Sequence, residues 1–165
     1  MVTAEELAPI RTAAFVRPAG DPAPLPYLDD AEDRVRGGLD ITLEAYLSTE
    51  TMRRAGTAPL RLTRTSFATI YWTVAQMVAH HASNGCNLEI GDLIGSGTVS
   101  GPDKSSWGSL LELTARGREP IALPSGEERG FLADGDEIIF RGFAEKPGYP
   151  RIGFGECRAV ILPAT

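Results

Sequence analysis

The chain has 165 residues, of which 42% are hydrophobic, and this length is enough to bury one sizeable core and form one domain or most of one. A formal net charge of -6 without a Lys/Arg cluster argues against a nucleic-acid partner, because neutralising phosphates requires concentrated positive charge. No apolar run approaches the roughly 20 residues of a membrane-spanning helix, so we expect a cytoplasmic protein with no membrane partner. Cys86 and Cys157 have no spacing typical of a zinc site, and we expect reduced thiols packed in the fold.

The N-terminal part of the chain is rich in proline, and the run from Pro18 to Pro26 cannot form a regular helix. Each proline ring removes a backbone hydrogen-bond donor and fixes its own φ angle. We therefore expect residues 1–28 to form an extended arm that lies against other parts of the protein. Residues 29–165 are expected to form the body.

Two alternating segments and one amphipathic segment follow the arm. Apolar and polar side chains alternate over residues 38–47 and again over 60–65, which predicts a hairpin of two strands with one solvent-facing side. From about residue 66 to about residue 83, apolar side chains recur at spacings of three and four, which predicts one main helix. Ser66 is its expected N-cap, because a serine hydroxyl can accept a hydrogen bond from the first helical turn.

Short segments separated by Gly, Ser, Asp and Pro make up the rest of the chain. We expect strands over residues 110–114, 119–123, 137–142 and 155–162. This spacing is typical of a β-rich body with several tight turns. The predicted fold class is therefore α+β and strand-dominated, with a mixed β-sheet and one main helix.

Two segments contain residue types that could carry chemistry. The segment from Gly95 to Gly101 combines glycines, which let a backbone approach a ligand, with hydroxyls that can hold an anionic oxygen. A glycine-rich turn between two strands would have the same composition. Glu112 stands among leucines, where desolvation makes a charged carboxylate costly unless a donor compensates. A polar residue on the solvent face of a strand would show the same pattern.

The remaining titratable groups are expected to have structural roles. His80 and His81 are adjacent, and neighbouring helical positions point about 100° apart, which favours packing or capping over a shared metal. The acidic groups at residues 29–33 and 134–136 resemble parts of hard-cation loops but lack the further oxygen ligands of a complete loop. We interpret them as a solvated loop and as a turn that leads into a strand.

Several sequence words together form one resemblance that covers nearly the whole chain. The words are Asn84-Gly85-Cys86-Asn87-Leu88, Gly91-Asp92-Leu93-Ile94, Gly95-Ser96-Gly97-Thr98-Val99-Ser100-Gly101-Pro102, Leu110-Leu111-Glu112-Leu113, Phe131-Leu132-Ala133-Asp134-Gly135-Asp136-Glu137 and Arg151-Ile152-Gly153-Phe154-Gly155-Glu156-Cys157. They resemble the C-terminal part of the catalytic domain of the fumarylacetoacetase family. The resemblance implies the mixed-sheet, β-roll type of fold of that domain over residues 1–165.

The resemblance also implies roles for two residues. Thr98 occupies the place of the family's threonine that contacts the substrate carboxylate, and Glu112 that of the glutamate that pairs with a histidine to activate water. Mg²⁺ and/or Ca²⁺ is implied as the cofactor of the full-length protein. The family's metal ligands and catalytic histidine belong upstream of the matched words, and no Glu-x-Glu pair occurs in this chain. No metal ligand is therefore assigned here, and we expect the isolated chain to be inactive.

The activity implied by the resemblance is hydrolysis of a carbon-carbon bond in 4-fumarylacetoacetate, a small diketo acid, during tyrosine and phenylalanine degradation. A homodimer is implied as well, and apolar side chains such as Ile41, Leu43 and Ile139 on unpaired strands would favour association. Two alternatives stay open at this point. One is another diketo-acid hydrolase, decarboxylase or hydratase of the same superfamily, and the other is a non-catalytic fragment or interaction module.

Overall fold

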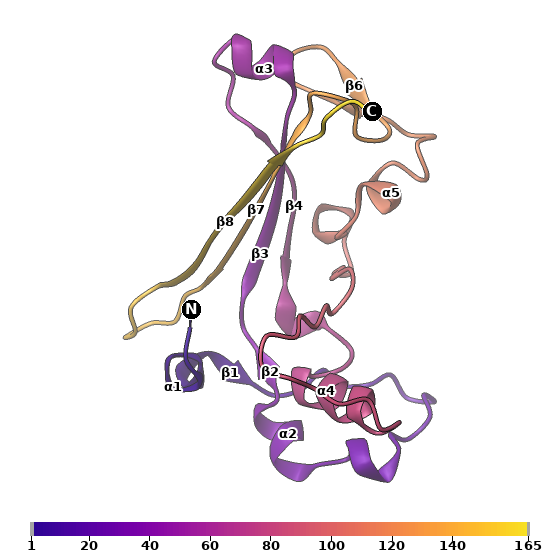
Figure 1. Ribbon diagram of the computed structural model, residues 1–165, viewed down its shortest axis with the longest axis vertical. Coiled ribbons are helices and arrows are strands. Elements are labelled where there is room, and N and C mark those ends of the chain that lie inside the picture. The colour runs from indigo at the N-terminus through magenta and orange to yellow at the C-terminus, as the bar shows by residue number, and fades with distance from the viewer. Residues whose placement is uncertain (1, 165) are drawn as a thin grey trace.

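The computed structural model describes residues 2–164, and its centre is an antiparallel four-stranded sheet in the order β4-β3-β7-β8. The sheet runs along an elongated molecule, with α3 and β6 at one end and α1, α2 and α4 at the other (Figure 1). The short strand pair β5-β6 lies at the end that carries α3, and the pair β1-β2 lies at the end that carries α1, α2 and α4. The predicted strand-dominated α+β class is confirmed.

Most helices are short, whereas the strands of the central sheet are longer. The helices are α1 (Ala4–Leu7), α2 (Ala31–Arg36), α3 (Glu50–Arg54), α4 (Val74–Ala82) and α5 (Leu110–Leu113), with 3-10 turns at Ala8–Ile10, Pro26–Leu28, Phe67–Thr69 and Lys104–Ser106. The strands are β1 (Arg11–Thr12), β2 (Gly38–Leu39), β3 (Thr42–Ser48), β4 (Leu60–Ser66), β5 (Ile121–Ala122), β6 (Glu128–Arg129), β7 (Glu137–Ala144) and β8 (Ile152–Val160). Within residues 2–164, no helix combines the length and the apolar character that crossing a membrane requires.

The predicted hairpin is confirmed, because β3 pairs antiparallel with β4. The connection between the two strands contains α3, which the sequence pattern did not indicate. Thr49 caps this helix, since its hydroxyl accepts a hydrogen bond from the Met52 N–H at 3.1 Å. Gly56 then adopts a φ angle of 67°, a left-handed conformation that glycine reaches without steric cost. This returns the chain to β4.

The main helix is shorter than expected, and its predicted start at Ser66 is wrong. Ser66 caps only the 3-10 turn Phe67–Thr69, after which Ile70 is extended with a ψ angle of 135°. The helix α4 begins after Thr73, which forms a capping box with the third residue of the helix. The apolar spacing before Thr73 therefore belongs to a turn and an extended segment, which a periodicity argument cannot separate from a helix.

The strand predicted over residues 110–114 is also wrong, because this segment forms the helical turn α5. Ser109 accepts a hydrogen bond from the Glu112 N–H, and this N-cap decides the local conformation of a short apolar run. Residues 119–123 contribute only the two-residue strand β5. The other two expected strands are present as β7 and β8, with shifted bounds.

The two faces of the central sheet differ, as alternation along the strands predicts. Ion pairs lie across one face, for example between Arg61 and Glu44 at 3.4 Å. Ile41 and Leu43 instead help to line an open, largely apolar hollow of about 690 Å³. Ile139, which we expected to be uncovered, has an exposed fraction of 0%, and that expectation is wrong.

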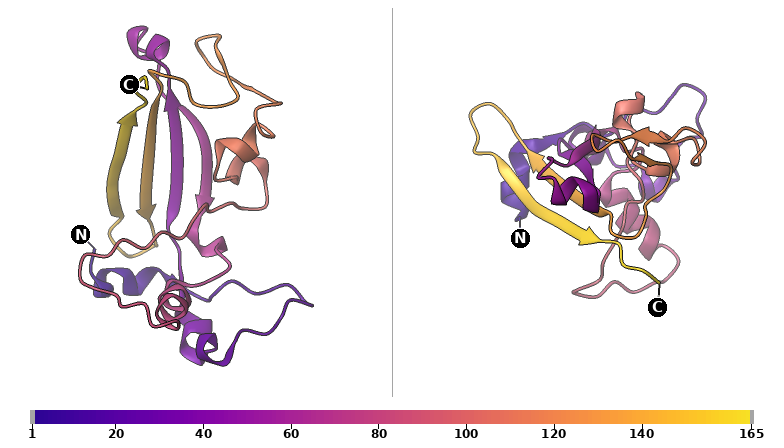
Figure 2. Two further views of the ribbon diagram at one scale, coloured as in Figure 1. Left: turned by 45° about the vertical axis from the view of Figure 1, so that its right-hand side comes forward. Right: turned by 90° about the horizontal axis from the view of Figure 1, so that it is seen from above.

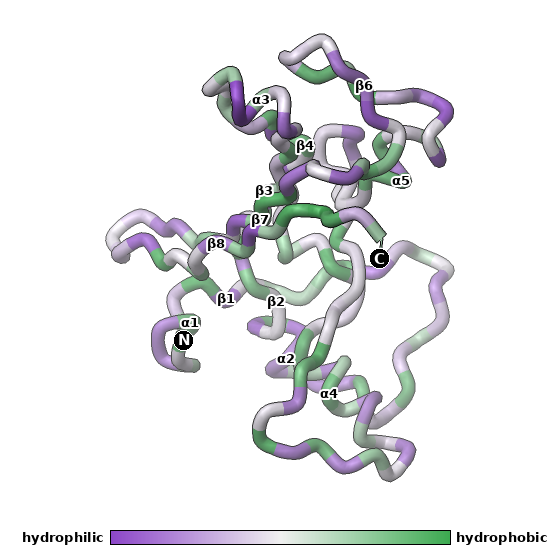
Figure 3. The backbone as a smooth tube through the Cα atoms, turned by 45° about the horizontal axis from the view of Figure 1, so that its top comes forward, coloured by the Kyte–Doolittle hydropathy of each residue, from purple (hydrophilic) through white to green (hydrophobic). Residues whose placement is uncertain are grey.

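The buried core lies at the α3 end of the sheet, where Leu47, Met52 and Leu123 pack together. Partly buried side chains surround this cluster, namely Leu60, Leu62, Ile121 and Ile138. Hydrophobic segments of β3 and β4 lie side by side in this region (Figure 3). Cys86 and Cys157 are free and exposed, so the expectation of packed thiols is wrong.

The N-terminal residues contact the body at several points. Strand β1 pairs with β2, with Arg11 opposite Leu39, and the Asp40 N–H donates to the Ile10 carbonyl at 2.9 Å. These bonds attach the start of the chain to the end of the sheet that carries α2 and α4. The division into an arm over residues 1–28 and a body over 29–165 stays a prediction.

Candidate active site

One cleft lies where the segment before α4, the glycine-rich loop formed by residues 95–101, and α5 meet. The chain between the loop and α5 runs beside the β4 edge of the sheet (Figure 2), where the Thr63 hydroxyl donates to the Ser105 carbonyl at 3.2 Å. The cleft has a volume of about 530 Å³ and includes both residues singled out in the sequence, Thr98 and Glu112. Its lining residues are Thr69, Ile70, Tyr71, Trp72, Met77, Ser96, Thr98, Val99, Ser100, Ser109 and Glu112.

The helical turn α5 exposes Glu112 to the cleft. Leu113 of this turn is buried, with an exposed fraction of 6%, whereas Leu111 is 51% exposed and Glu112 is exposed as well. The interpretation of Glu112 as a carboxylate desolvated by neighbouring leucines is therefore wrong. The alternative, a polar residue on the solvent face of a strand, is wrong as well, because the segment is helical. Glu112 is held by hydrogen bonds instead.

Two serine hydroxyls donate to the Glu112 carboxylate. Ser109 Oγ lies 2.8 Å from Oε2, and Ser100 Oγ lies 2.9 Å from Oε2 and 3.1 Å from Oε1. Oε2 is thus the more heavily used oxygen, and Oε1 keeps acceptor capacity because a carboxylate offers about four lone-pair sites. Glu112 can therefore accept a further hydrogen bond from a group in the cleft.

The glycine-rich loop and α5 approach one another closely at Gly108. A Cβ atom at this position would lie 2.3 Å from the Val99 carbonyl oxygen and 2.8 Å from Thr98 Cγ2. Only glycine therefore allows this approach without a shift of the backbone. The buried Val99 side chain anchors the loop, while the neighbouring Thr98 is exposed. This arrangement places Thr98 at the surface of the cleft.

Tyr71 and Trp72 form an aromatic wall of the cleft, and residues of the N-terminal arm contact this wall. The Arg17 guanidinium carbon lies 4.1 Å from the centre of the Trp72 rings and 5.0 Å from that of Tyr71. The Tyr71 hydroxyl donates to the Asp21 carboxylate at 2.7 Å, and this bond raises the pKa of Tyr71. Sequence reasoning missed this wall because it placed Tyr71 on a continuous helix.

The sequence of residues 24–162 matches the model of a protein family described as fumarylacetoacetate (FAA) hydrolase C-terminal. The chain belongs to this family. The resemblance that the sequence words indicated is thereby confirmed.

Curated fumarylacetoacetases are similar to nearly the whole of this chain. The enzyme of Homo sapiens is 46% identical over 151 residues, which are 92% of this chain and 34% of that protein. The enzyme of Arabidopsis thaliana is 42% identical over 164 residues, 99% of this chain and 36% of that protein. The enzyme of Dictyostelium discoideum is 39% identical over 166 residues, with coverages of 99% and 36%. The chain thus spans about a third of the length of these relatives.

The two histidines of this family member lie outside the cleft. His80 is in the last turn of α4, and its Nδ1 is 2.9 Å from the Tyr27 hydroxyl. This bond joins α4 to the arm, in keeping with a packing role. Neither His80 nor His81 is among the residues that line the cleft beside Glu112. The catalytic roles of Thr98 and Glu112 stay predictions that rest on the family motif.

The acidic clusters are used within the fold. Asp29 forms an ion pair with Arg34, and Asp33 accepts a hydrogen bond from the Thr73 hydroxyl at 2.7 Å. Within residues 2–164, no three His, Cys, Asp or Glu side chains are grouped so that they could hold a metal ion. The described residues therefore do not fit the ligand set of the metal that the family implies.

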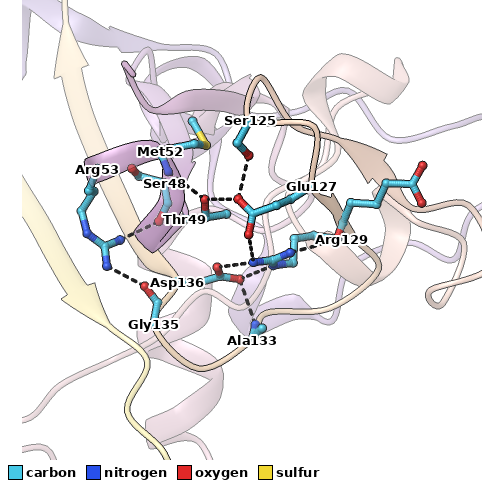
Figure 4. A network of polar contacts seen from close by, with 11 residues as sticks. Ser48, Thr49, Met52, Arg53, Ser125, Glu127, Arg129, Ala133, Gly135 and Asp136 are labelled. Carbon is cyan, nitrogen blue, oxygen red and sulfur yellow. Dashed lines mark hydrogen bonds and ion pairs between the residues drawn. The ribbon is translucent and has the colours of Figure 1, made fainter. Parts of the chain in front are cut away.

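Asp136 belongs to a buried polar network and not to a cation loop (Figure 4). Its carboxylate is fully buried and accepts bonds from Arg129 Nε at 2.8 Å and Nη2 at 3.0 Å. Arg129 also pairs with Glu127, which accepts a hydrogen bond from the Thr49 hydroxyl. The Thr49 bond, helped by other donors, lowers the pKa of Glu127 to about 2. These bonds attach β6 to the start of α3, and none of these residues lines the cleft.

Proposed function

We propose that the complete protein hydrolyses 4-fumarylacetoacetate to fumarate and acetoacetate, as a step of tyrosine and phenylalanine degradation. The observation that carries this proposal is that Thr98 and Glu112, both assigned from the family motif, line one cleft. The cleft lies in a chain that is 46% identical to the fumarylacetoacetase of Homo sapiens over 92% of its length. A diketo acid is of a suitable size for a cleft of about 530 Å³.

In this proposal Glu112 orients a general base. Oε1, the less used carboxylate oxygen, accepts a hydrogen bond from an imidazole other than those of His80 and His81. The imidazole removes a proton from water, and the water oxygen forms a bond to a ketone carbon of the substrate. The carbon-carbon bond then breaks, and its electron pair leaves with acetoacetate as an enolate that takes up a proton. Thr98, at the surface of the same cleft, binds the substrate carboxylate.

Mg²⁺ and/or Ca²⁺ is proposed as the cofactor of the complete protein. A divalent cation supplies Lewis-acid stabilisation of carbonyl oxygens when it is bound. Glu112 is the one carboxylate among the described residues that line the cleft, and it already accepts hydrogen bonds from two serine hydroxyls. No part in metal binding is therefore assigned to the residues of this chain.

The test is Glu112→Gln in the complete protein, assayed by the loss of the diketone absorbance of fumarylacetoacetate. Glutamine keeps the size of the side chain but removes the negative charge that stabilises a protonated base. We expect kcat to fall by roughly 100- to 10,000-fold, as is typical when general-base assistance is lost. The melting temperature should stay close to that of the wild type, because the side chain is exposed.

A matched control is Glu119→Gln, which changes another exposed glutamate close to α5. Glu119 pairs with Lys104 at 3.1 Å and does not line the cleft, so its substitution should leave kcat unchanged. A wild-type rate in Glu112→Gln would show that Glu112 has no part in catalysis. Activity of the complete protein on a different diketo acid, but not on fumarylacetoacetate, would instead favour another reaction of the same superfamily.

We further propose that the protein is a cytoplasmic homodimer. Phe140 and Phe154, with exposed fractions of 52% and 43%, line the apolar hollow on the central sheet. An apolar surface of this kind is a candidate for burial against a second copy. Sedimentation velocity of the complete protein at micromolar concentration should report a dimer, and a single monomeric species would contradict this proposal.

A further inference from the structure

Ser100 is bonded so that the direction of its hydroxyl proton is determined. Its Oγ accepts a hydrogen bond from the Gly108 N–H at 3.0 Å, and an N–H can only donate. One lone pair of the hydroxyl is thereby used, and its proton is available for another acceptor. Glu112 Oε2, at 2.9 Å, lies within the usual O–H···O range to accept this proton, and Oε1 lies slightly farther away, at 3.1 Å.

The bond between Ser100 and Glu112 differs from the bond between Ser109 and Glu112. Ser109 is the N-cap of α5 and contacts Glu112 from three residues away, within the same helical turn. Ser100 belongs to the glycine-rich loop and lies two positions after Thr98. Among the hydrogen bonds of the described residues to this carboxylate, the one from Ser100 is therefore the link between α5 and the loop.

The close approach at Gly108 supports this link. The absence of a Cβ lets the Gly108 backbone lie against Val99 and Thr98, which brings its N–H within reach of Ser100. The loop position of Thr98 and the orientation of Glu112 are consequently coupled through one hydroxyl. An exposed glutamate on a single helical turn would otherwise sample several rotamers.

We propose that Ser100 is a positioning residue, which holds the Glu112 carboxylate in a fixed orientation relative to the substrate contact at Thr98. This proposal rests on the proposed function, because it needs Glu112 to act on the base that activates water. Ser100 accepts from a backbone amide and donates to the carboxylate, so it neither gains nor loses a proton during the reaction. Its contribution is to keep Oε1 directed toward the group that Glu112 orients.

The experiment compares Ser100→Ala, Ser100→Thr and Glu112→Gln in the complete protein, with fumarylacetoacetate as substrate. Ser100→Ala should lower kcat by roughly 10-fold, which is at the lower end of the effect of losing a hydrogen bond to a charged group. KM should change little, because Ser100 is assigned no substrate contact. Ser100→Thr retains a hydroxyl and should recover most of the lost rate. Melting temperatures measured on each variant separate these effects from loss of folded protein.

A double variant tests whether Ser100 acts through Glu112. In the Glu112→Gln background, Ser100→Ala should cause no further loss of kcat, because the group that Ser100 positions has already been disabled. If the double variant instead lost kcat by the product of the two single-variant factors, Ser100 would act independently of Glu112, and the proposal would be overturned. A threonine variant as slow as the alanine variant, with an unchanged melting temperature, would overturn it too.

Ser125→Ala is the matched control. Ser125 Oγ donates to Glu127 Oε2 at 2.7 Å, which is another serine-to-glutamate bond, and neither residue lines the cleft. Its kcat should equal that of the wild type. A slow Glu112→Gln variant together with a normal Ser100→Ala variant would overturn the positioning role and leave the proposed function intact. A normal Glu112→Gln variant would overturn both.

Discussion

The substitution Asp136→Asn is expected to destabilise the protein strongly, although it preserves the shape of the side chain. Asp136 has an exposed fraction of 0%, and its Oδ2 accepts bonds from Arg129 Nε at 2.8 Å and from the Ala133 N–H at 2.9 Å. Its Oδ1 accepts from Arg129 Nη2 at 3.0 Å. An asparagine can present only one oxygen, so its amide group would face a donor of Arg129 or Ala133.

The size of the effect follows from the burial of the two partners. Removing one partner of a buried ion pair costs about 3–5 kcal/mol in the free energy of unfolding. The Arg129 side chain is 17% exposed and keeps its pairing with Glu127 at 3.1 Å, so we expect the lower end, about 3 kcal/mol. For a chain of this size, that loss corresponds to a fall in melting temperature of roughly 6–12 °C.

Urea unfolding of the wild type and the Asp136→Asn variant measures this loss. The matched control is Glu145→Gln, because Glu145 pairs with Arg151 at the same 2.8 Å but both side chains are more than half exposed. Its free energy of unfolding should change by less than about 0.5 kcal/mol. An Asp136→Asn variant within about 1 kcal/mol of the wild type would refute the view that this network stabilises the fold.

Two further predictions concern Glu127 and Gly108. Thr49 and other donors lower the pKa of Glu127 in the folded protein to about 2, from an ordinary value of 4.5. The stability that this lowered pKa gives is therefore present above about pH 4.5 and is lost as the pH falls toward 2. Thr49→Val should weaken this acid dependence, which is measured as urea midpoints between pH 6 and pH 2. An unchanged dependence would contradict the role of Thr49. Gly108→Ala should destabilise the protein by about 1–3 kcal/mol, because the alanine Cβ would lie 2.3 Å from the Val99 carbonyl oxygen. The same variant should also have a lower kcat. Wild-type stability and rate in this variant would argue against the close approach of the glycine-rich loop and α5.

The class of fold and the two candidate residues could be predicted from the amino-acid sequence alone. Alternation in β3 and β4 marks strands with two unlike faces, and the sheet has such faces because side-chain direction in a strand depends only on position along the chain. Thr98 and Glu112 were identified from sequence words, whose spacing is likewise a local property. Both residues line the same cleft.

The surroundings of these residues are evident only from the three-dimensional fold. Periodicity could not show that Ser66 caps only a 3-10 turn, because turns and helices share apolar spacings of three and four. Periodicity also could not show that Glu112 is exposed on a helical turn. The apolar composition of residues 110–113 suggested a strand, whereas the N-cap hydrogen bond that Ser109 accepts favours a helical turn.

Sequence patterns also could not predict contacts between residues that are far apart in the chain. Glu127 accepts a hydrogen bond from the hydroxyl of Thr49, 78 positions earlier in the chain, and the wall formed by Tyr71 and Trp72 is contacted by Arg17 of the arm. Such pairings form only when the chain brings distant segments together, so their energies depend on burial and on distance in space. Separation along the sequence therefore does not reveal them.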